Sequence, residues 1–305
     1  MTHHVDIAII GAGPAGLSAA LWSARYLHST VVIDSGDPRN WETRGVNGYL
    51  GLPGITPPEL RARGRAEASQ AGATFIDAHV STVSRLDDDD FTIRLDNGMA
   101  IVATRLLLAI GIRDVWPDIP GLDRCYGATA HVCPDCDGYE ARDSHIVVIG
   151  SGRKAMGMAL ALTTWTRDIV ICTNGESPNL TRAWLDQLQT LNIPVLDTRI
   201  ACARSQHGTL RYLDLEGGMP LDCDHLFFCM GQVPADDLGV QLGCRRDDIG
   251  RILTNAHYHT SVPNVYAAGD IVHSTQLAIT AAAGGAIAAS AMHHSLLPAV
   301  RTLAP

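Results

Sequence analysis

Residues 5–16 read VDIAIIGAGPAG, and this stretch decides the fold of the first part of the chain. Its apolar first half is typical of a parallel strand that is buried on both faces. The strand leads into a Gly-x-Gly-x-x-Gly turn at Gly11, Gly13 and Gly16, and a helix is predicted over residues 15–26. In such a turn the first glycine permits the bend, the second lets backbone approach a pyrophosphate, and the third lets helix pack on strand. We therefore predict a dinucleotide-binding α/β fold.

A carboxylate follows at the spacing that this fold uses. A second strand is predicted over residues 30–33 and ends at Asp34, about twenty residues beyond the glycines, where an acid can hydrogen-bond an adenosine ribose. Pro14 and Ala15 lie at the predicted helix start, where the helix dipole favours a phosphate. The alternative is a glycine-rich turn that binds no ligand. The strand, helix and acid around this turn make that interpretation the weaker one.

A second nucleotide-binding turn is predicted further along the chain. A strand over residues 145–149 runs into Gly150-Ser151-Gly152-Arg153-Lys154-Ala155 and a helix. The next strand ends in Thr173-Asn174-Gly175, which offers neither the carboxylate that suits NAD nor the arginines that suit NADP. Gly150, Gly152, Arg153, Lys154 and Ala155 are therefore candidates for binding a second nucleotide. Arg153 and Lys154 are equally compatible with a solvent-facing helix start.

Size and composition bound the class of protein. A chain of 305 residues is long for one core, so we expect two domains. A net charge of −9 argues against non-specific nucleic-acid binding. The sequence has no uncharged apolar run of about 18 residues and no signal-peptide pattern, so we expect no membrane span. Cysteine usage suggests a reducing, cytoplasmic compartment.

Segments rich in turn-forming or polar residues suggest where the domains meet. The stretch 116–121 (WPDIPG) marks a first boundary, and a polar stretch over residues 245–250 resembles a return linker. We therefore expect one domain built from residues 1–115 and 247–305. A second domain, residues 116–246, is inserted into it.

Near its start the inserted domain contains HVCPDCDGYE, at residues 131–140. Cys133 and Cys136 can close into a small, readily reduced disulfide that stores two electrons, and Asp137 can serve the accompanying proton transfer. A zinc site is the alternative, with His131 as a possible third ligand. No fourth ligand at matched spacing is evident and no second Cys-x-x-Cys occurs, so we predict redox chemistry and no metal.

Taken together, these motifs resemble the low-molecular-weight thioredoxin reductases, and the similarity runs over nearly the whole chain. The resemblance implies two Rossmann-like domains, the second inserted into the first, a bound FAD and a homodimer. It also implies that Cys136 faces the flavin, that Cys133 attacks the partner disulfide and that Asp137 is the general acid or base. The FAD-binding residues that it implies are Gly11, Gly13, Pro14, Ala15, Gly16, Asp34, Asn47, Val80, Ala109, Gly111, Gly269, Asp270, Gln276, Leu277 and Ala278.

Three departures from that family stand out. Thr173-Asn174-Gly175 replaces the His-Arg-Arg signature for NADPH, and Gln276-Leu277-Ala278 replaces Arg-Gln-Ala. The segment Cys-Pro-Asp-Cys-Asp-Gly-Tyr-Glu replaces Cys-Ala-x-Cys-Asp-Gly-Phe. These departures resemble branches of the family that have lost the use of NADPH. The branches are the deeply-rooted and the diflavin-linked disulfide oxidoreductases and the ferredoxin-dependent flavin reductases. The diflavin-linked enzymes bind a second FAD.

We therefore expect a FAD-dependent disulfide oxidoreductase that acts on a thioredoxin-like protein or a small disulfide, with ferredoxin as a possible donor. Two alternatives are a dithiol oxidase that passes electrons to oxygen and a true NADPH-thioredoxin reductase with a divergent pocket. Relatives of the oxidase type usually carry histidine where Asp137 stands, which favours the reductase. A passive redox sensor is a third alternative, in which Asp137 would have no evident purpose.

Overall fold

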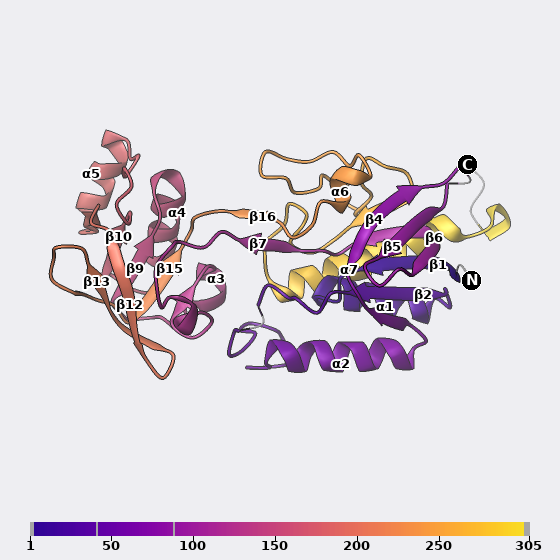
Figure 1. Cartoon of the computed structure of the whole chain (residues 1–305), viewed down its shortest axis with the longest axis horizontal. Coiled ribbons are helices and arrows are strands. Elements are labelled where there is room, and N and C mark those ends of the chain that lie inside the picture. Colours follow the sequence, from indigo (N-terminus) through magenta and orange to yellow (C-terminus); the bar gives the residue numbers. More distant parts are fainter. Residues whose placement is uncertain (1–2, 41, 88, 302–305) are drawn as a thin grey trace. The chain divides into compact units, whose positions relative to one another are not determined.

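The computed structural model describes residues 3–40, 42–87 and 89–301. The chain divides into two compact units, shown in Figure 1. None of the described helices is both long enough and apolar enough to cross a membrane. The first unit comprises Met1–Trp41, Tyr49–Arg113 and Val233–Pro305, and the second comprises Glu42–Gly48 and Asp114–Gln232.

The first unit is built on a mixed sheet with the strand order β3-β2-β1-β6-β5-β4, and β17 also pairs with β6. Pairing is parallel among β3, β2, β1, β6 and β17 and antiparallel in the β6-β5-β4 part. The carboxyl ends of the parallel strands therefore meet at one edge. The strands are β1 (His3–Ile10), β2 (Thr30–Asp34), β3 (Thr74–Asp77), β4 (Val80–Arg85), β5 (Phe91–Leu95), β6 (Ala100–Leu108) and β17 (Val265–Ala267).

Alternation along β1 divides this unit into two cores. Ile7 and Ile9 face one core, which holds alanines of α1 and α7, and Ala8 and Ile10 face the other, which includes Leu238 of α6. Because successive side chains of a strand point to opposite faces, an entirely apolar strand must be covered on both sides. The helices are α1 (Pro14–Arg25), α2 (Pro57–Gln70), α6 (Leu238–Gln241) and α7 (Ala278–Leu296), followed by a 3-10 turn at Ala299–Arg301.

The second unit contains a parallel sheet with the order β11-β10-β9-β15-β8 and an antiparallel sheet with the order β12-β13-β14. Val147 and Ile149 of β9 pack toward the antiparallel sheet, while Ile146 and Val148 pack toward α4 and α5. Its elements are η1 (Asp123–Cys125), β8 (Ala130–His131), α3 (Pro134–Asp137), β9 (Ile146–Ile149), α4 (Gly152–Leu162), β10 (Ile169–Cys172), α5 (Arg182–Thr190), β11 (Val195–Leu196), β12 (Ile200–Gln206), β13 (Thr209–Leu215), β14 (Leu221–Asp222) and β15 (His225–Phe228).

The predicted fold class is confirmed, but the unit boundaries differ from those expected. The chain returns to the first unit at Val233, not at residue 247, because Leu238 and Cys244 belong to the core of the first sheet. It passes between the units as β7 (Ile112–Asp114) and β16 (Gln232–Pro234), which pair with each other.

The short segment 42–48 also belongs to a different unit from the one expected. The sequence places it in the first domain, whereas the structure groups it with the second unit. The amide of Arg44 donates to the carbonyl of Gly127 over 3.2 Å. Gly127 lies so close to this segment that a Cβ atom there would stand 2.5 Å from the carbonyl oxygen of Glu42. These contacts tie the segment to the unit that carries the dithiol.

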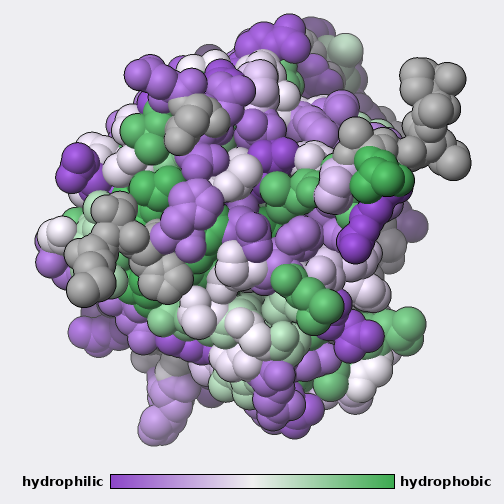
Figure 2. All heavy atoms as spheres, turned by 90° about the vertical axis from the view of Figure 1, so that its right-hand side faces the viewer, coloured by the Kyte–Doolittle hydropathy of each residue, from purple (hydrophilic) through white to green (hydrophobic). Residues whose placement is uncertain are grey.

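Figure 2 shows the face that lies on the right-hand side of Figure 1. Hydrophilic and hydrophobic residues are interspersed over the described part of this face. Among the exposed large apolar side chains are Leu27 on the turn after α1 and Trp22 on α1 itself. Such scattered apolar residues are ordinary on a protein surface.

Candidate active site

The glycine turn after β1 has the geometry of a pyrophosphate cradle. Gly11 adopts a φ of +101°, and a Cβ atom there would lie 2.4 Å from the carbonyl oxygen of Ala109. At Gly16 a Cβ atom would lie 1.8 Å from the carbonyl oxygen of Gly11, so both positions require glycine. A Cβ atom on Gly13, in contrast, would meet nothing within 4 Å. The turn is thus closed by its first and third glycines and open at its second.

The predicted ribose acid, Asp34, lies at the end of β2 and is already oriented by two groups. Its carboxylate accepts hydrogen bonds from the amide of Ala12 at 2.9 Å and from the Arg61 guanidinium at 2.6 Å. Arg61 also donates to the carbonyl of Ala12. Arg61 comes from α2 and was not predicted, because no local motif links a helix arginine to an acid 27 residues earlier.

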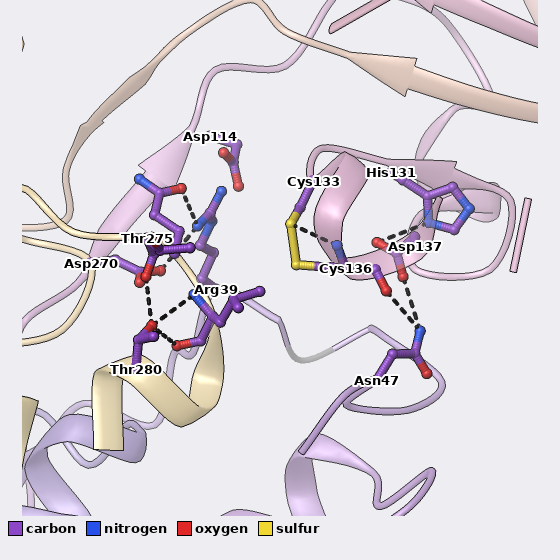
Figure 3. The surroundings of a disulfide bond; sticks show 12 residues. Arg39, Asn47, Asp114, His131, Cys133, Cys136, Asp137, Asp270, Thr275 and Thr280 are labelled. Carbon is purple, nitrogen blue, oxygen red and sulfur yellow. Dashed lines mark hydrogen bonds and ion pairs between the residues drawn. A yellow bond between two sulfur atoms is a disulfide. The ribbon is translucent and has the colours of Figure 1, made fainter. Parts of the chain in front are cut away.

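A second set of predicted FAD residues meets at the same edge of the sheet. Gly269 follows β17, and a Cβ atom there would lie 3.0 Å from the Cβ of Ala15 at the start of α1. The carboxylate of Asp270 and the side-chain carbonyl of Gln276 both accept hydrogen bonds from Arg39, at 3.0 and 3.1 Å. Figure 3 shows this cluster beside the start of α7. Arg39 is another participant that sequence reasoning missed.

The remaining FAD candidates fall into two groups. Ala109 and Gly111 follow β6 near the glycine turn, while Leu277 is the N-cap residue of α7 and Ala278 its first residue. Val80 and Asn47 are the two remaining candidates. The Val80 side chain is only 3% exposed within a hydrophobic core, so its main chain alone is free to face a ligand. Asn47 lies in the second unit.

The first unit fits a dinucleotide such as FAD. Gly13, the N-cap residue of α1, has no side chain that could cap the helix, so the first-turn amides are available to an anion. The open space at Gly13 and the oriented carboxylate of Asp34 supply the other two features of a dinucleotide site. FAD bound there would supply the two-electron chemistry.

The dithiol lies in the second unit at the start of the short helix α3. Cys133 and Cys136 form a disulfide, and Cys133 is the N-cap residue of the helix. The Sγ atom of Cys133 accepts a hydrogen bond from the amide of Cys136 over 3.1 Å, an arrangement that also stabilises a thiolate. Both cysteines are partly exposed. The pair is therefore accessible for exchange with an external disulfide.

Asp137 is held from two sides, as Figure 3 shows. The side-chain amide of Asn47 donates to its Oδ1 atom at 3.4 Å and to the carbonyl of Cys136 at 3.2 Å. On the other side, Nδ1 of the buried His131 lies 3.4 Å from Oδ2 of Asp137. His131 was considered in the sequence only as a metal ligand.

A second imidazole, that of His225, lies beside His131. The Nε2 atom of His131 is 3.0 Å from Nδ1 of His225. Burial, with a smaller contribution from His131, lowers the pKa of His225 to about 4. No sequence motif connects these residues, because they are 94 positions apart and meet only through the pairing of β8 with β15.

Close packing fixes the far side of the dithiol helix. A Cβ atom on Gly138 would stand 2.4 Å from the ring of Trp165, so the indole packs directly on the backbone after Asp137. Trp165 belongs to the core between the parallel sheet and its helices. Its role is therefore structural support of α3.

The second glycine turn is occupied by the chain's own residues. The amide of Gly152 donates to the carbonyl of Pro178 at 2.8 Å. The Ser151 hydroxyl, at the N-cap of α4, lies 3.4 Å from the carboxylate of Glu176. Lys154 donates to the carbonyl of Met230, while the side chain of Arg153 is exposed. The loop 173–179 thus covers the turn with a carboxylate and a carbonyl.

The six other cysteines are single thiols, and most are buried. Burial raises the pKa of Cys229 to about 11 and also raises the pKa values of Cys125, Cys172, Cys223 and Cys244. A thiol with a raised pKa is a poor nucleophile at neutral pH. Thiol chemistry is therefore concentrated at Cys133 and Cys136.

Comparison with known proteins agrees with this site. The family described as pyridine nucleotide-disulphide oxidoreductase matches residues 5–285. The thioredoxin reductase of Treponema pallidum is 31% identical, with 94% of this chain and 95% of that protein covered. The thioredoxin reductase of Bacillus subtilis is 27% identical, with 95% and 94% covered. The crystal structure of HlmI superposes with a TM-score of 0.92 at 36% identity, over 97% of this chain and 94% of that one.

Fold and site together define a two-domain flavoprotein with a redox-active disulfide. The chain belongs to the pyridine nucleotide-disulphide oxidoreductase family. Within it the protein is thioredoxin reductase-like: a flavin-dependent thiol-disulfide oxidoreductase whose family implies bound FAD.

Proposed function

We propose that this enzyme passes electrons from bound FAD to a protein or small-molecule disulfide through Cys133 and Cys136, and that NADPH is not its electron donor. The observation that supports the proposal about NADPH is the closed turn at Ser151 and Gly152. A dinucleotide there needs free amides and a positive environment for its phosphates. Gly152 donates instead to Pro178, and the carboxylate of Glu176 would repel a phosphate.

The strand end beside this turn supports the same proposal. The side-chain carbonyl of Asn174 accepts a hydrogen bond from the amide of Ile200 at 2.7 Å, and the Thr173 hydroxyl donates to the carbonyl of Glu176. Arg199 is nearby, but it lies 3.4 Å from Glu216, with which it pairs. These contacts argue against NADPH and equally against a second FAD at Gly150–Ala155. A ferredoxin, or else a flavin-linked protein, is the donor that we propose.

The chain's own part in the reaction is thiol–disulfide exchange. The Cys133 thiolate attacks the partner disulfide, whose S–S bond breaks as a Cys133–partner bond forms, and the leaving thiolate takes a proton from Asp137. Cys136 then gives up its proton and attacks Cys133, so the Cys133–partner bond breaks as the enzyme disulfide re-forms. The second partner thiolate leaves and takes that proton. Asn47 and His131 orient the Asp137 carboxyl during these transfers.

The partner that we propose is a thioredoxin-like protein or a small disulfide, by analogy with the relatives named above. A concavity of about 570 Å³ lies next to the dithiol helix and is lined by Pro134, Arg153, Lys154, Gly157 and Met158. Pro134 directly follows Cys133, so a partner seated there would reach the attacking sulfur. We also propose a homodimer, as the family resemblance implies.

The test is an anaerobic titration of the purified holoenzyme, following the visible flavin absorbance. NADPH at stoichiometric amounts should leave the flavin oxidised, while dithionite reduces it and reduced ferredoxin reduces it in the presence of a donor system. Rapid bleaching by NADPH would overturn the proposal on the donor. Replacing Cys136 by Ser should abolish disulfide turnover with FAD still bound, and persisting turnover would overturn the role of the dithiol.

Dithiol oxidation by oxygen remains a second candidate because of one observation. No histidine follows Cys136, yet the His131 imidazole lies 3.4 Å from Asp137 and thus near the dithiol. A base at that place can deprotonate a substrate thiol. Rapid oxygen consumption with a small dithiol, together with failure to reduce thioredoxin, would favour the oxidase over the reductase.

A further inference from the structure

We propose that His131 and His225 form a proton relay that carries protons between solvent and Asp137 during thiol–disulfide exchange. The inference rests on the proposed function, since it assumes that Asp137 gives and takes the proton of that reaction. It assigns a role to two histidines that the motif around the dithiol does not explain.

The geometry of the relay follows from the pairing of β8 with β15. Phe227 lies opposite His131 in the parallel register, so His225, two residues earlier on β15, projects from the same face. His131 points to Asp137 with one ring nitrogen and to His225 with the other, at 3.4 and 3.0 Å. Figure 3 shows the first of these contacts, beside the disulfide. The three groups thus form one line from the dithiol helix into the sheet.

The burial of the two rings suits a relay. His131 is 5% exposed and cannot exchange protons with water directly, whereas His225 is only partly buried and can. Asp137 is 16% exposed in the free enzyme, and a partner seated on the dithiol would cover that face. A route through His131 stays open when the partner is bound. A histidine pair that only stabilised the fold would not need one ring that is accessible to solvent.

The charges around His225 keep its ring neutral at physiological pH. Burial and the neighbouring His131 lower its pKa, while Asp224 and Asp137 act in the opposite direction with smaller effect. On the other side of His131 the ring of Phe227 contributes no charge. A neutral imidazole has one donor and one acceptor nitrogen, so it can accept a proton at one side and release another at the other.

The transfers balance as follows. When Asp137 protonates the leaving thiolate, its carboxylate takes the proton from Nδ1 of His131. His131 takes a proton at Nε2 from Nδ1 of His225, which takes one from water at its other nitrogen. When Cys136 later attacks Cys133, its own proton passes to the second partner thiolate as that thiolate leaves. Reduction of one disulfide by the Cys133 thiolate therefore consumes one proton, which the relay supplies from solvent.

The experiment compares two partner disulfides in single turnover with dithionite-reduced holoenzyme. An aliphatic disulfide such as bis(2-hydroxyethyl) disulfide releases a basic thiolate that needs a proton, whereas 5,5′-dithiobis(2-nitrobenzoate) releases a stable thiolate that does not. His225→Gln keeps a polar partner for His131 but cannot pass a proton, and His225→Phe removes both functions. General acid catalysis is worth roughly 10²–10⁴-fold, so we expect at least about a tenfold loss with the aliphatic disulfide in both variants.

The control variant is His145→Phe. His145 directly precedes β9, and its side chain pairs with Asp168 at 2.7 Å, outside the chain of Asp137, His131 and His225. It should behave like wild type with both disulfides. The aryl disulfide should react at the wild-type rate in all variants, and added imidazole should partly restore the slow reaction of His225→Gln and His225→Phe.

The outcomes separate the relay from the proposed function. If reduced wild type fails to reduce either disulfide, the proposed function fails. If wild type is active but both His225 variants match it with the aliphatic disulfide, the relay is overturned and the function stands. Recovery of the rate in His225→Gln alone would show a structural hydrogen bond and also overturn the relay. Should His225→Phe not fold, His225→Gln with imidazole rescue decides the question.

Discussion

The side-chain amide of Asn47 donates to both the carboxylate of Asp137 and the carbonyl of Cys136, from a segment 89 residues away from the latter. The family resemblance suggests a flavin contact for Asn47, but the structure places it beside the dithiol helix. It supplies a donor for the Cys136 carbonyl in the last turn of α3. Asn47 therefore fixes where the acid lies relative to the disulfide.

Replacing Asn47 by Ala should slow thiol–disulfide exchange several-fold, because Asp137 then loses one of its two orienting contacts. Each lost hydrogen bond is worth about 1 kcal/mol. Single-turnover reduction of an aliphatic disulfide measures the effect. Asn97→Ala removes an exposed turn asparagine of the first unit, which accepts a hydrogen bond from the amide of Met99, and serves as the control. Equal rates for the two variants would contradict the role of Asn47.

Arg61→Ala should weaken FAD binding. Arg61 holds Asp34 at 2.6 Å and the carbonyl of Ala12, so its loss frees the ribose acid and loosens the glycine turn. A charge-assisted hydrogen bond of this kind contributes about 1.5–3 kcal/mol, which corresponds to roughly a tenfold rise in the dissociation constant or more. Titration of apoprotein with FAD measures it. Arg63→Ala, which removes an exposed pair with Glu59 on the same helix, should leave FAD affinity unchanged.

Gly285→Ala should destabilise the first unit. A Cβ atom there would stand 1.9 Å from the carbonyl oxygen of Ala15, which belongs to the backbone of α1 and cannot move aside cheaply. Overpacking of this kind costs about 1–3 kcal/mol or more. In α4, Gly157→Ala meets nothing within 4 Å and should be neutral or stabilise its helix by up to about 1 kcal/mol. Thermal unfolding of the two holoproteins gives the comparison, and a stable Gly285→Ala variant would contradict it.

Stability should fall as the pH is lowered through about 6.5, the ordinary pKa of histidine. His28 and His293 face each other at 3.0 Å, and burial lowers the pKa of both, against a smaller opposing effect of Asp6 on His28. A lowered pKa means that the unfolded chain binds more protons in this range, so acid favours unfolding.

The variant His293→Phe tests that pH dependence. It keeps a ring stacked on Tyr26, whose centroid lies 4.2 Å from that of His293, but removes one titrating group. Denaturant midpoints measured between pH 7.5 and 5.5 should vary less in this variant than in wild type. If the midpoints of the variant varied with pH as strongly as those of wild type, the His28–His293 pair would not contribute to the pH dependence of stability.

Local sequence determined the framework of this protein. Strand, glycine turn and helix are encoded within a dozen consecutive residues, because burial period and backbone freedom are local properties. The predictions over residues 5–10, 15–26 and 30–33 are confirmed by β1, α1 and β2. The disulfide and its acid are likewise adjacent in sequence, so Cys133, Cys136 and Asp137 could be recognised from their spacing.

Only the tertiary structure decided which distant side chains serve those motifs. Arg61 reaches Asp34, Arg39 reaches Asp270, and Asn47 reaches Asp137 through chain folding that no spacing encodes. Parallel pairing of β8 with β15 brings His225 to His131, and loop 173–179 folds back on its own glycine turn. A hydrogen bond depends on position in space to within a few tenths of an ångström. Sequence patterns specify which elements form, and packing of those elements specifies what their side chains touch.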